Sequence, residues 1–199
     1  MSTHGSPQSS YGVCGKLFTV VQSVKNEKPP SALHTNRHLW QRNMMYTANG
    51  SDGFSITRVF SVRVETVWDA WTQSAALAAW WRTHQTIPVT EEWQVDLQVG
   101  GHYRYTTVNM ASGELSVTGG TYQELDPPHR LVFTWGQPHA DAADTPLVAV
   151  TLEPVNHGTL LFFELRGASG APGDHFFYDG WSQVLDSLDD YLTSSCEGA

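Results

Sequence analysis

The longest helical pattern in the chain lies near its C-terminus, between Asp174 and Ser195. Apolar residues recur there with the spacing of one helix face; they are Phe177, Trp181, Leu185, Leu188 and Leu192, with Tyr178 and Val184 widening the stripe. The opposite face is polar and should face water; it carries Asp179, Ser182, Asp186, Asp189 and Asp190. A helix of about 20 residues, or about 30 Å, with one apolar face needs another layer to cover that face. The pattern therefore predicts a helix packed on a sheet.

Most of the chain before this helix alternates between apolar and polar residues, as strands with one buried face do. The predicted strands are 54–62, 92–97, 102–110, 115–125, 130–135, 147–155 and 159–166. Helical spacing predicts two short helices after the first strand, over 65–71 and 75–81, with Ser74 as a cap. Gly119-Gly120 predicts a kink inside a strand. This order predicts an α+β fold in which one curved antiparallel sheet grips the C-terminal helix.

The first 50 residues differ from the rest of the chain in composition. They contain every lysine of the protein and a single acidic residue, whereas six arginines and 19 acidic residues follow from position 51 onward. We therefore predict an N-terminal extension, residues 1–50, that is disordered or not native, a core domain over 51–195, and a short tail, 196–199. Two readings of the extension stay open: a targeting peptide, or a native start at Met44 or Met45.

Net charge and cysteine use exclude several classes of protein. The formal net charge of −9 argues against nucleic acid and against anionic membrane surfaces, because both attract basic proteins. Cys14 and Cys196 form no metal-binding pair and no disulfide framework. No apolar run is long enough to cross a membrane. We therefore expect a reduced, cytoplasmic protein with no membrane and no nucleic-acid partner.

Several short motifs occur in the order typical of one known family. They are RVFSVRVETVWDAWT at 58–72, AAWW at 78–81, DLQVGGHYRY at 96–105, GGTYQELDPPHRLVFTW at 119–135, GTLLFFEL at 158–165, and His175 followed by Gly180-Trp181, Leu185 and Leu188. Together they cover nearly the whole chain after residue 50. The chain thereby resembles the START-like (SRPBCC, helix-grip) superfamily. More narrowly, it resembles bacterial homologues of the C-terminal domain of the activator of the heat-shock chaperone ATPase.

This resemblance implies a deep cavity between the sheet and the long helix, which in many members binds an apolar or amphipathic small molecule. Strand alternation and the helix stripe place an aromatic set on the same inner side. We predict that these rings line the cavity: Trp81, Tyr103, Tyr105, Tyr122, Phe133, Trp135, Phe163, Phe177 and Trp181. The expected volume is about 300–1,000 Å³. A solid aromatic core is the alternative, which periodicity alone does not separate from a cavity.

Candidates for catalysis and for metal binding are few. His175, at the expected mouth of the cavity, is the one weak catalytic candidate, since histidine titrates near neutral pH. No second titratable group is aimed at it, so a helix-start residue bonded to a neighbouring strand is the preferred reading. The nine histidines form no metal-ligand spacing, and no glycine-rich loop opens a helix to hold phosphate. We therefore expect no metal and no cofactor.

Three functions follow from these observations, in order of preference. The first is binding of a hydrophobic or amphipathic small molecule, without chemistry. The second is an enzyme of the cyclase or hydrolase kind that uses His175 and cavity tyrosines. The third is a co-chaperone-like interaction protein, which is weakened because residues 1–50 do not resemble the upstream partner domain of the eukaryotic activator.

The last strand also predicts self-association. Alternation directs Leu161, Phe163 and Leu165 inward, so Leu160 and Phe162 should point to the convex side, where the family usually has polar residues. We expect Val132, and Val148 or Ala149, to extend this apolar face. A homodimer through it is one prediction. Cover by the apolar run at 17–21 within the same chain is the alternative.

Overall fold

The computed structural model describes residues 52–197. The predicted extension and the final two residues of the tail lie outside this range. In chain order the elements are β1 (Gly53–Phe60), α2 (Val64–Thr72), α3 (Ser74–Trp80), β2 (Thr86–Pro88), η2 (Thr90–Glu92), β3 (Gln94–Val95), β4 (His102–Asn109), β5 (Leu115–Asp126), β6 (Arg130–Thr134), β7 (Leu147–Val155), β8 (Gly158–Arg166) and α4 (Phe177–Glu197).

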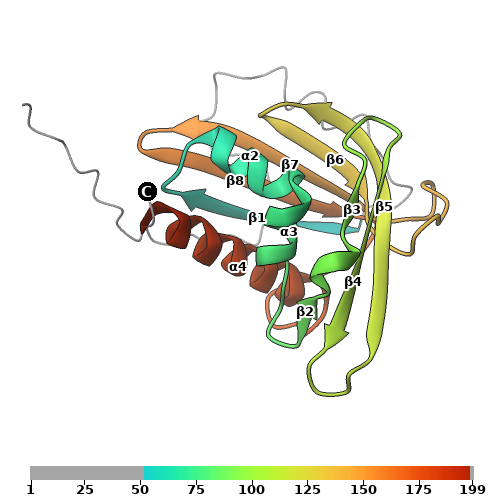
Figure 1. Ribbon diagram of the computed structural model, residues 1–199. Coiled ribbons are helices and arrows are strands. Elements are labelled where there is room, and N and C mark those ends of the chain that lie inside the picture. The colour runs from blue at the N-terminus through green and yellow to red at the C-terminus, as the bar shows by residue number, and fades with distance from the viewer. Residues whose placement is uncertain (1–51, 198–199) are drawn as a thin grey trace, which may run out of the picture.

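The strands form one antiparallel sheet with the order β1-β8-β7-β6-β5-β4-β2, and β3 pairs with β4 beside β2. The sheet curls into a half-barrel, and α2, α3 and α4 lie on its concave side (Figure 1). The α+β fold predicted from the sequence, with a curved sheet around the C-terminal helix and two short helices after the first strand, is confirmed. Pro88 lies in the edge strand β2, where its missing N–H breaks no ladder.

The long strand β5 carries the bend of the sheet. Its first half pairs with β4, from Leu115 to Thr121, and its second half pairs with β6, from Tyr122 onward. At the junction, a Cβ on Gly120 would collide with the carbonyl oxygen of Thr134, so only glycine lets the two backbones approach this closely. At the predicted kink, β5 therefore changes its pairing partner from β4 to β6.

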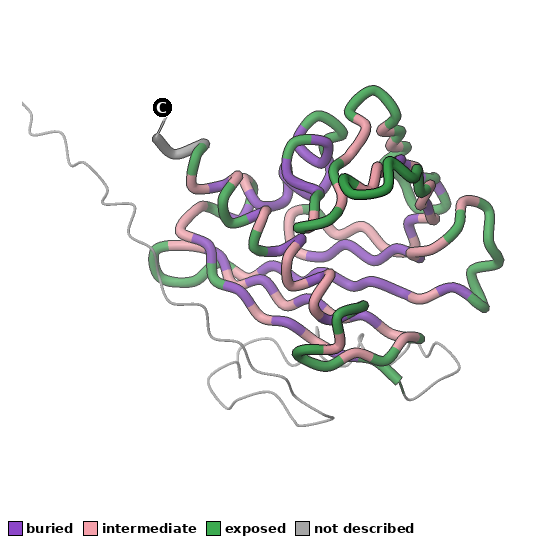
Figure 2. The backbone as a smooth tube through the Cα atoms, turned by 90° about the horizontal axis from the view of Figure 1, so that it is seen from below, coloured by how far each residue is buried: buried purple, intermediate pink, exposed green. Residues whose placement is uncertain are grey.

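The core is built from the predicted inner faces. Along β8 the buried residues alternate with half-buried ones, and on α4 the stripe Trp181, Leu185, Leu188 and Leu192 is buried (Figure 2). Tyr178 and Val184 are also buried. Phe177 departs from the stripe, because 41% of its surface is exposed. Period-2 and helical spacing thus predicted the two faces that meet in the core.

Helix α4 begins at Phe177, three residues later than predicted. Asp174 precedes it as a cap: its carboxylate accepts hydrogen bonds from the backbone N–H groups of Phe176 at 2.8 Å and Tyr178 at 3.1 Å. Desolvation acts to raise the pKa of Asp174, but these and two further backbone donors outweigh it and lower the pKa. Among residues 52–197, no helix is long and apolar enough to span a membrane.

The polar face of α4 is less uniform than predicted. The Arg58 side chain points inward from β1 and is 5% exposed; its guanidinium donates to the Ser182 hydroxyl at 2.9 Å and to Asp186 at 3.1 Å. Ser182 is therefore half-buried at the edge of the interface, whereas Asp186 still faces water. The buried Arg58 guanidinium on the inner face of β1 therefore connects the edge of the sheet to α4 by hydrogen bonds.

Three local predictions were wrong. Ser74 is the first residue of α3, and the preceding Gln73 occupies the cap position without a side-chain hydrogen bond. The strand predicted at 92–97 is reduced to Gln94–Val95, because η2 occupies the residues before it. The short strand β2 was not among the predicted strands.

The convex face of the sheet holds a second apolar cluster. Val132, Leu147 and Ala149 form it, and all three are buried. Leu160 and Phe162 are on the same face and half-buried, as predicted, whereas Val148 points to the concave core and does not extend this cluster. The homodimer through this face stays a prediction.

Candidate functional site

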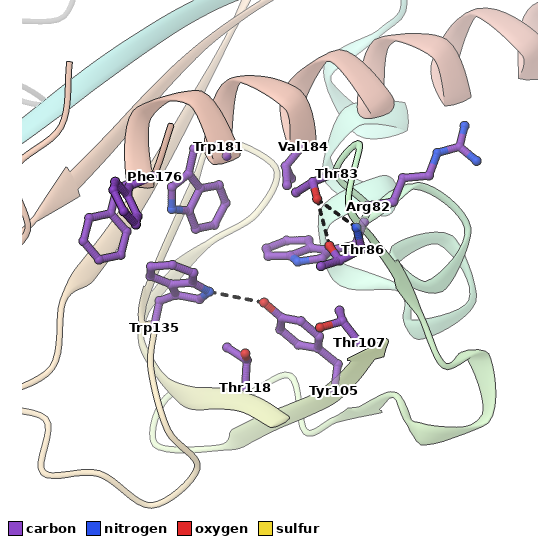
Figure 3. Close-up of a pocket in the computed structure, with 13 residues that line it drawn as sticks. Arg82, Thr83, Thr86, Tyr105, Thr107, Thr118, Trp135, Phe176, Trp181 and Val184 are labelled. Atoms are coloured by element: carbon purple, nitrogen blue, oxygen red, sulfur yellow. Dashed lines mark hydrogen bonds between the residues drawn. The ribbon is translucent and has the colours of Figure 1, made fainter. Parts of the chain in front are cut away.

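A cleft of about 170 Å³ opens between the start of α4 and the curled end of the sheet (Figure 3). It is smaller than the predicted 300–1,000 Å³. Its lining consists of Trp81, Arg82, Thr83, Thr86, Tyr105, Thr107, Thr118, Trp135, Phe176, Phe177, Gly180, Trp181 and Val184. The cleft is small because aromatic rings that could have walled an open cavity pack against one another instead.

Four rings from four parts of the fold form the walls. Trp81 follows α3, Tyr105 lies in β4, Trp135 follows β6, and Trp181 lies in α4. Their ring centroids are 5.4 Å apart for Trp81 and Trp181, 5.1 Å for Trp135 and Trp181, and 5.4 Å for Trp81 and Tyr105, with interplanar angles of 78°, 62° and 61°. Neighbouring walls therefore meet at steep angles, in the edge-to-face geometry that aromatic pairs prefer.

The mouth of the cleft is formed by two exposed phenylalanines. Phe176 is 78% exposed and Phe177 is 41% exposed. The Phe177 ring stands against Trp135 with centroids 5.9 Å apart. Large apolar side chains that face water beside a hollow are typical of a surface that binds something.

The rim opposite the phenylalanines is polar and fixed to α4. The Thr83 and Thr86 hydroxyls are hydrogen-bonded at 2.9 Å, the His84 N–H donates to the Gln183 side-chain oxygen at 2.9 Å, and the Ser187 hydroxyl donates to the Arg82 carbonyl at 3.3 Å. The Arg82 guanidinium extends away from the cleft (Figure 3). This rim therefore presents threonine side chains to the cleft and turns the charge of Arg82 to solvent.

Tyr105 is the one titratable group whose side chain reaches the wall of the cleft. Its hydroxyl accepts a hydrogen bond from the Trp135 indole N–H at 3.2 Å, and its ring stacks on Trp93 with centroids 4.4 Å apart. Burial raises its pKa above 10, and hydrogen bonds from Trp135, Thr118 and Trp81 act in the opposite direction. Tyr105 is therefore neutral at physiological pH and serves as a hydrogen-bonding group.

The predicted ring residues do not all line the cleft. Trp81, Tyr105, Trp135, Phe177 and Trp181 line the cleft. Tyr103, Tyr122 and Phe133 surround a separate void of about 10 Å³, which is at most the size needed for one water molecule. Phe163 lines neither space and packs on Trp181, with centroids 4.5 Å apart. The predicted rings therefore lie partly around a cleft at one end and partly in the core behind it.

Several lining residues were missed in the sequence. Thr107 lies two residues after Tyr105 on the same strand face, so alternation could have found it. Thr118 pairs directly with Tyr105 across β4 and β5, which only the strand register reveals. Phe176 precedes the helix and follows no periodic signal.

The comparison with protein-family models gives one match. The model of the family described as "Activator of Hsp90 ATPase homolog 1-like protein" matches residues 61–193, which is most of the chain. The chain belongs to this family. The match covers every element from α2 to nearly the end of α4, including all four walls of the cleft. No curated protein matches the chain.

Solved structures of bacterial proteins share the fold. Protein CV1439 from Chromobacterium violaceum has 28% sequence identity and a TM-score of 0.62, over 71% of this chain and 98% of that protein. The AHSA1-like protein from Aeromonas hydrophila has 23% identity and a TM-score of 0.60, over 72% and 93%. Protein Ms6760 from Mycobacterium smegmatis has 20% identity and a TM-score of 0.57, over 72% and 92%, and shows the fold alone.

His175, the weak catalytic candidate, is not part of the cleft lining. Its side chain is 90% exposed, and its ring Nδ1 lies 3.7 Å from the Asp179 carboxylate. Its backbone N–H donates to Asp179 at 2.9 Å, and its φ of 57° places it in the turn before α4. Within residues 52–197, no group of three metal-ligating side chains comes together.

Proposed function

We propose that the cleft binds a small hydrophobic or amphipathic molecule, without chemistry at this site. The observation that carries the proposal is the convergence of three indoles and one phenol on a surface hollow whose mouth holds two exposed phenylalanines. Burying such rings against an apolar guest is favourable by roughly 25 cal/mol per Å² of apolar surface. Membership of a helix-grip family, whose members often bind ligands, supports the same conclusion.

The lining also supports binding over catalysis. Among the described residues of the lining, the titratable side chains are Tyr105, which burial keeps protonated, and Arg82, which points outward. General acid–base chemistry needs a group whose pKa lies near the working pH and within hydrogen-bond reach of the substrate. The hydroxyl groups of the rim and of Tyr105 can instead orient the polar end of a guest.

Gly180 offers a way to close the cleft without touching its rings. It lies in the first turn of α4, lines the cleft, and a Cβ added there meets no atom within 4 Å. Gly180→Phe should therefore fill the mouth, whereas Gly180→Ala should leave it open and should stabilise the helix by about 0.5–1 kcal/mol. The two variants form a matched pair that differs in the size of one side chain.

The test is a titration with benzyl alcohol, a small neutral amphipathic probe, followed by tryptophan fluorescence. Wild type and Gly180→Ala should bind with similar affinity, and Gly180→Phe should bind roughly tenfold more weakly or not at all. Equal binding to all three proteins would contradict the proposal, and so would no binding to wild type. Thermal unfolding of each variant checks that the fold is intact.

A further inference from the structure

The walls of the cleft present aromatic faces in a box-like arrangement. Trp135 and Trp181 meet at 62°, Trp81 and Trp181 at 78°, and Phe177 closes on Trp135 at 81° (Figure 3). Three of the rings are indoles, the side chain whose π-face attracts cations best. A compact group in the hollow between these rings would contact several of them at once, rather than one.

The net charge of the chain from position 51 onward also favours a cation. From position 51 onward the chain has 19 acidic residues and six arginines. Three of those arginines are paired with carboxylates, namely Arg58, Arg130 and Arg166. Arg82, the charged residue of the lining, extends its guanidinium away from the hollow. The net negative charge of this part of the chain therefore favours the approach of a cation over that of an anion.

The absence of a carboxylate from the described lining limits the kind of cation. A primary ammonium carries three N–H donors and a tightly held hydration shell, so burying it without acceptors leaves those donors unpaired. A quaternary ammonium has no N–H donor, and its methyl groups suit apolar walls. Its charge can be met by ring faces alone.

We propose that the cleft recognises a methylated, quaternary ammonium group of the choline type. This inference rests on the proposed function and specifies the chemistry of the ligand. The cleft volume of about 170 Å³ lies below the range of about 300–1,000 Å³ for drug-sized ligands, so it suits a small head group. Thr86 and Thr107 line the same hollow, and their hydroxyls can bind the oxygen that such ligands carry.

The test compares choline with 3,3-dimethylbutan-1-ol, which has the same shape with a carbon atom in place of the charged nitrogen. Each is titrated into the full chain at matched ionic strength, and binding is measured by calorimetry. Choline should bind on the order of tenfold more tightly than its neutral isostere, the size expected for a desolvated cation–π contact. Trp135→Leu, at a half-buried position, should reduce this preference more than it reduces binding of the isostere.

The outcomes separate this inference from the proposed function. If the isostere binds as tightly as choline, or more tightly, the ammonium specificity is wrong and the apolar cleft stands. If choline does not bind, the inference fails, and benzyl alcohol binding then decides whether the proposed function fails with it. If Trp135→Leu kept the full preference for choline over its isostere, the proposal that the rings of the cleft bind the charged ammonium group would also be wrong.

Discussion

At the scale of single residues, buried phenols are the most perturbed groups of the fold. Tyr103 donates its hydroxyl to the Thr134 carbonyl at 2.8 Å, and burial, reinforced by Tyr105 and Tyr122, raises its pKa well above 10. Burial likewise raises the pKa values of Tyr105, Tyr122 and Tyr178. These side chains hold their protons more tightly in the folded state than in the unfolded state.

This difference predicts loss of stability at alkaline pH. A group whose pKa is raised by folding contributes its full stability below the unfolded value, here 10.0, and loses it as the pH rises toward the folded value. The free energy of unfolding should therefore fall steadily above pH 10, with tyrosinate absorbance appearing together with unfolding. Tyr103→Phe should show a shallower fall. Titration of all seven tyrosines near pH 10 in a folded protein would contradict the assignment.

At the scale of elements, α4 connects the core to the cleft. Its middle and later turns bury Leu185, Leu188 and Leu192 against the sheet and the short helices, while its first turns carry Phe177, Gly180 and Trp181 to the cleft. Trp181 belongs to both regions, because it packs on Phe163 and also lines the hollow. Its indole N–H is buried and has no hydrogen-bond partner in the part of the chain that the structure describes.

Replacing Trp181 should destabilise the protein, but less than loss of a ring packed on all sides. Trp181→Ala should lower the free energy of unfolding by about 3 kcal/mol, at the lower end of the range of about 3–5 kcal/mol for buried rings. Asp190→Ala, on the exposed face of the same helix, should change it by less than about 0.5 kcal/mol and serves as the control. Urea unfolding of both variants measures this, and an unchanged midpoint for Trp181→Ala would place its ring outside the core.

At the scale of the whole molecule, the sequence predicted the layers better than the site. The α4 stripe and the alternation of β8 are local patterns, so periodicity was sufficient for them. The residues that line the cleft come from distant parts of the chain, so no local pattern identifies them. Phe133 and Trp135 share one strand face, yet Phe133 lies in the core and Trp135 lines the cleft. The reason is that β6 ends at Thr134, so Trp135 lies beyond the strand, at the open end of the sheet. The volume was overestimated because the mutual packing of the rings depends on all four walls together.

The most direct test of a ligand cleft at this end of the molecule uses the indole N–H signals of the eight tryptophans in a two-dimensional NMR spectrum. Adding benzyl alcohol should shift the signals of Trp81, Trp135 and Trp181, which line the cleft. The signal of Trp68, which is buried on α2 and does not line the cleft, should stay in place. Uniform small shifts of all the signals, or a shift of Trp68 without Trp135 and Trp181, would contradict the account.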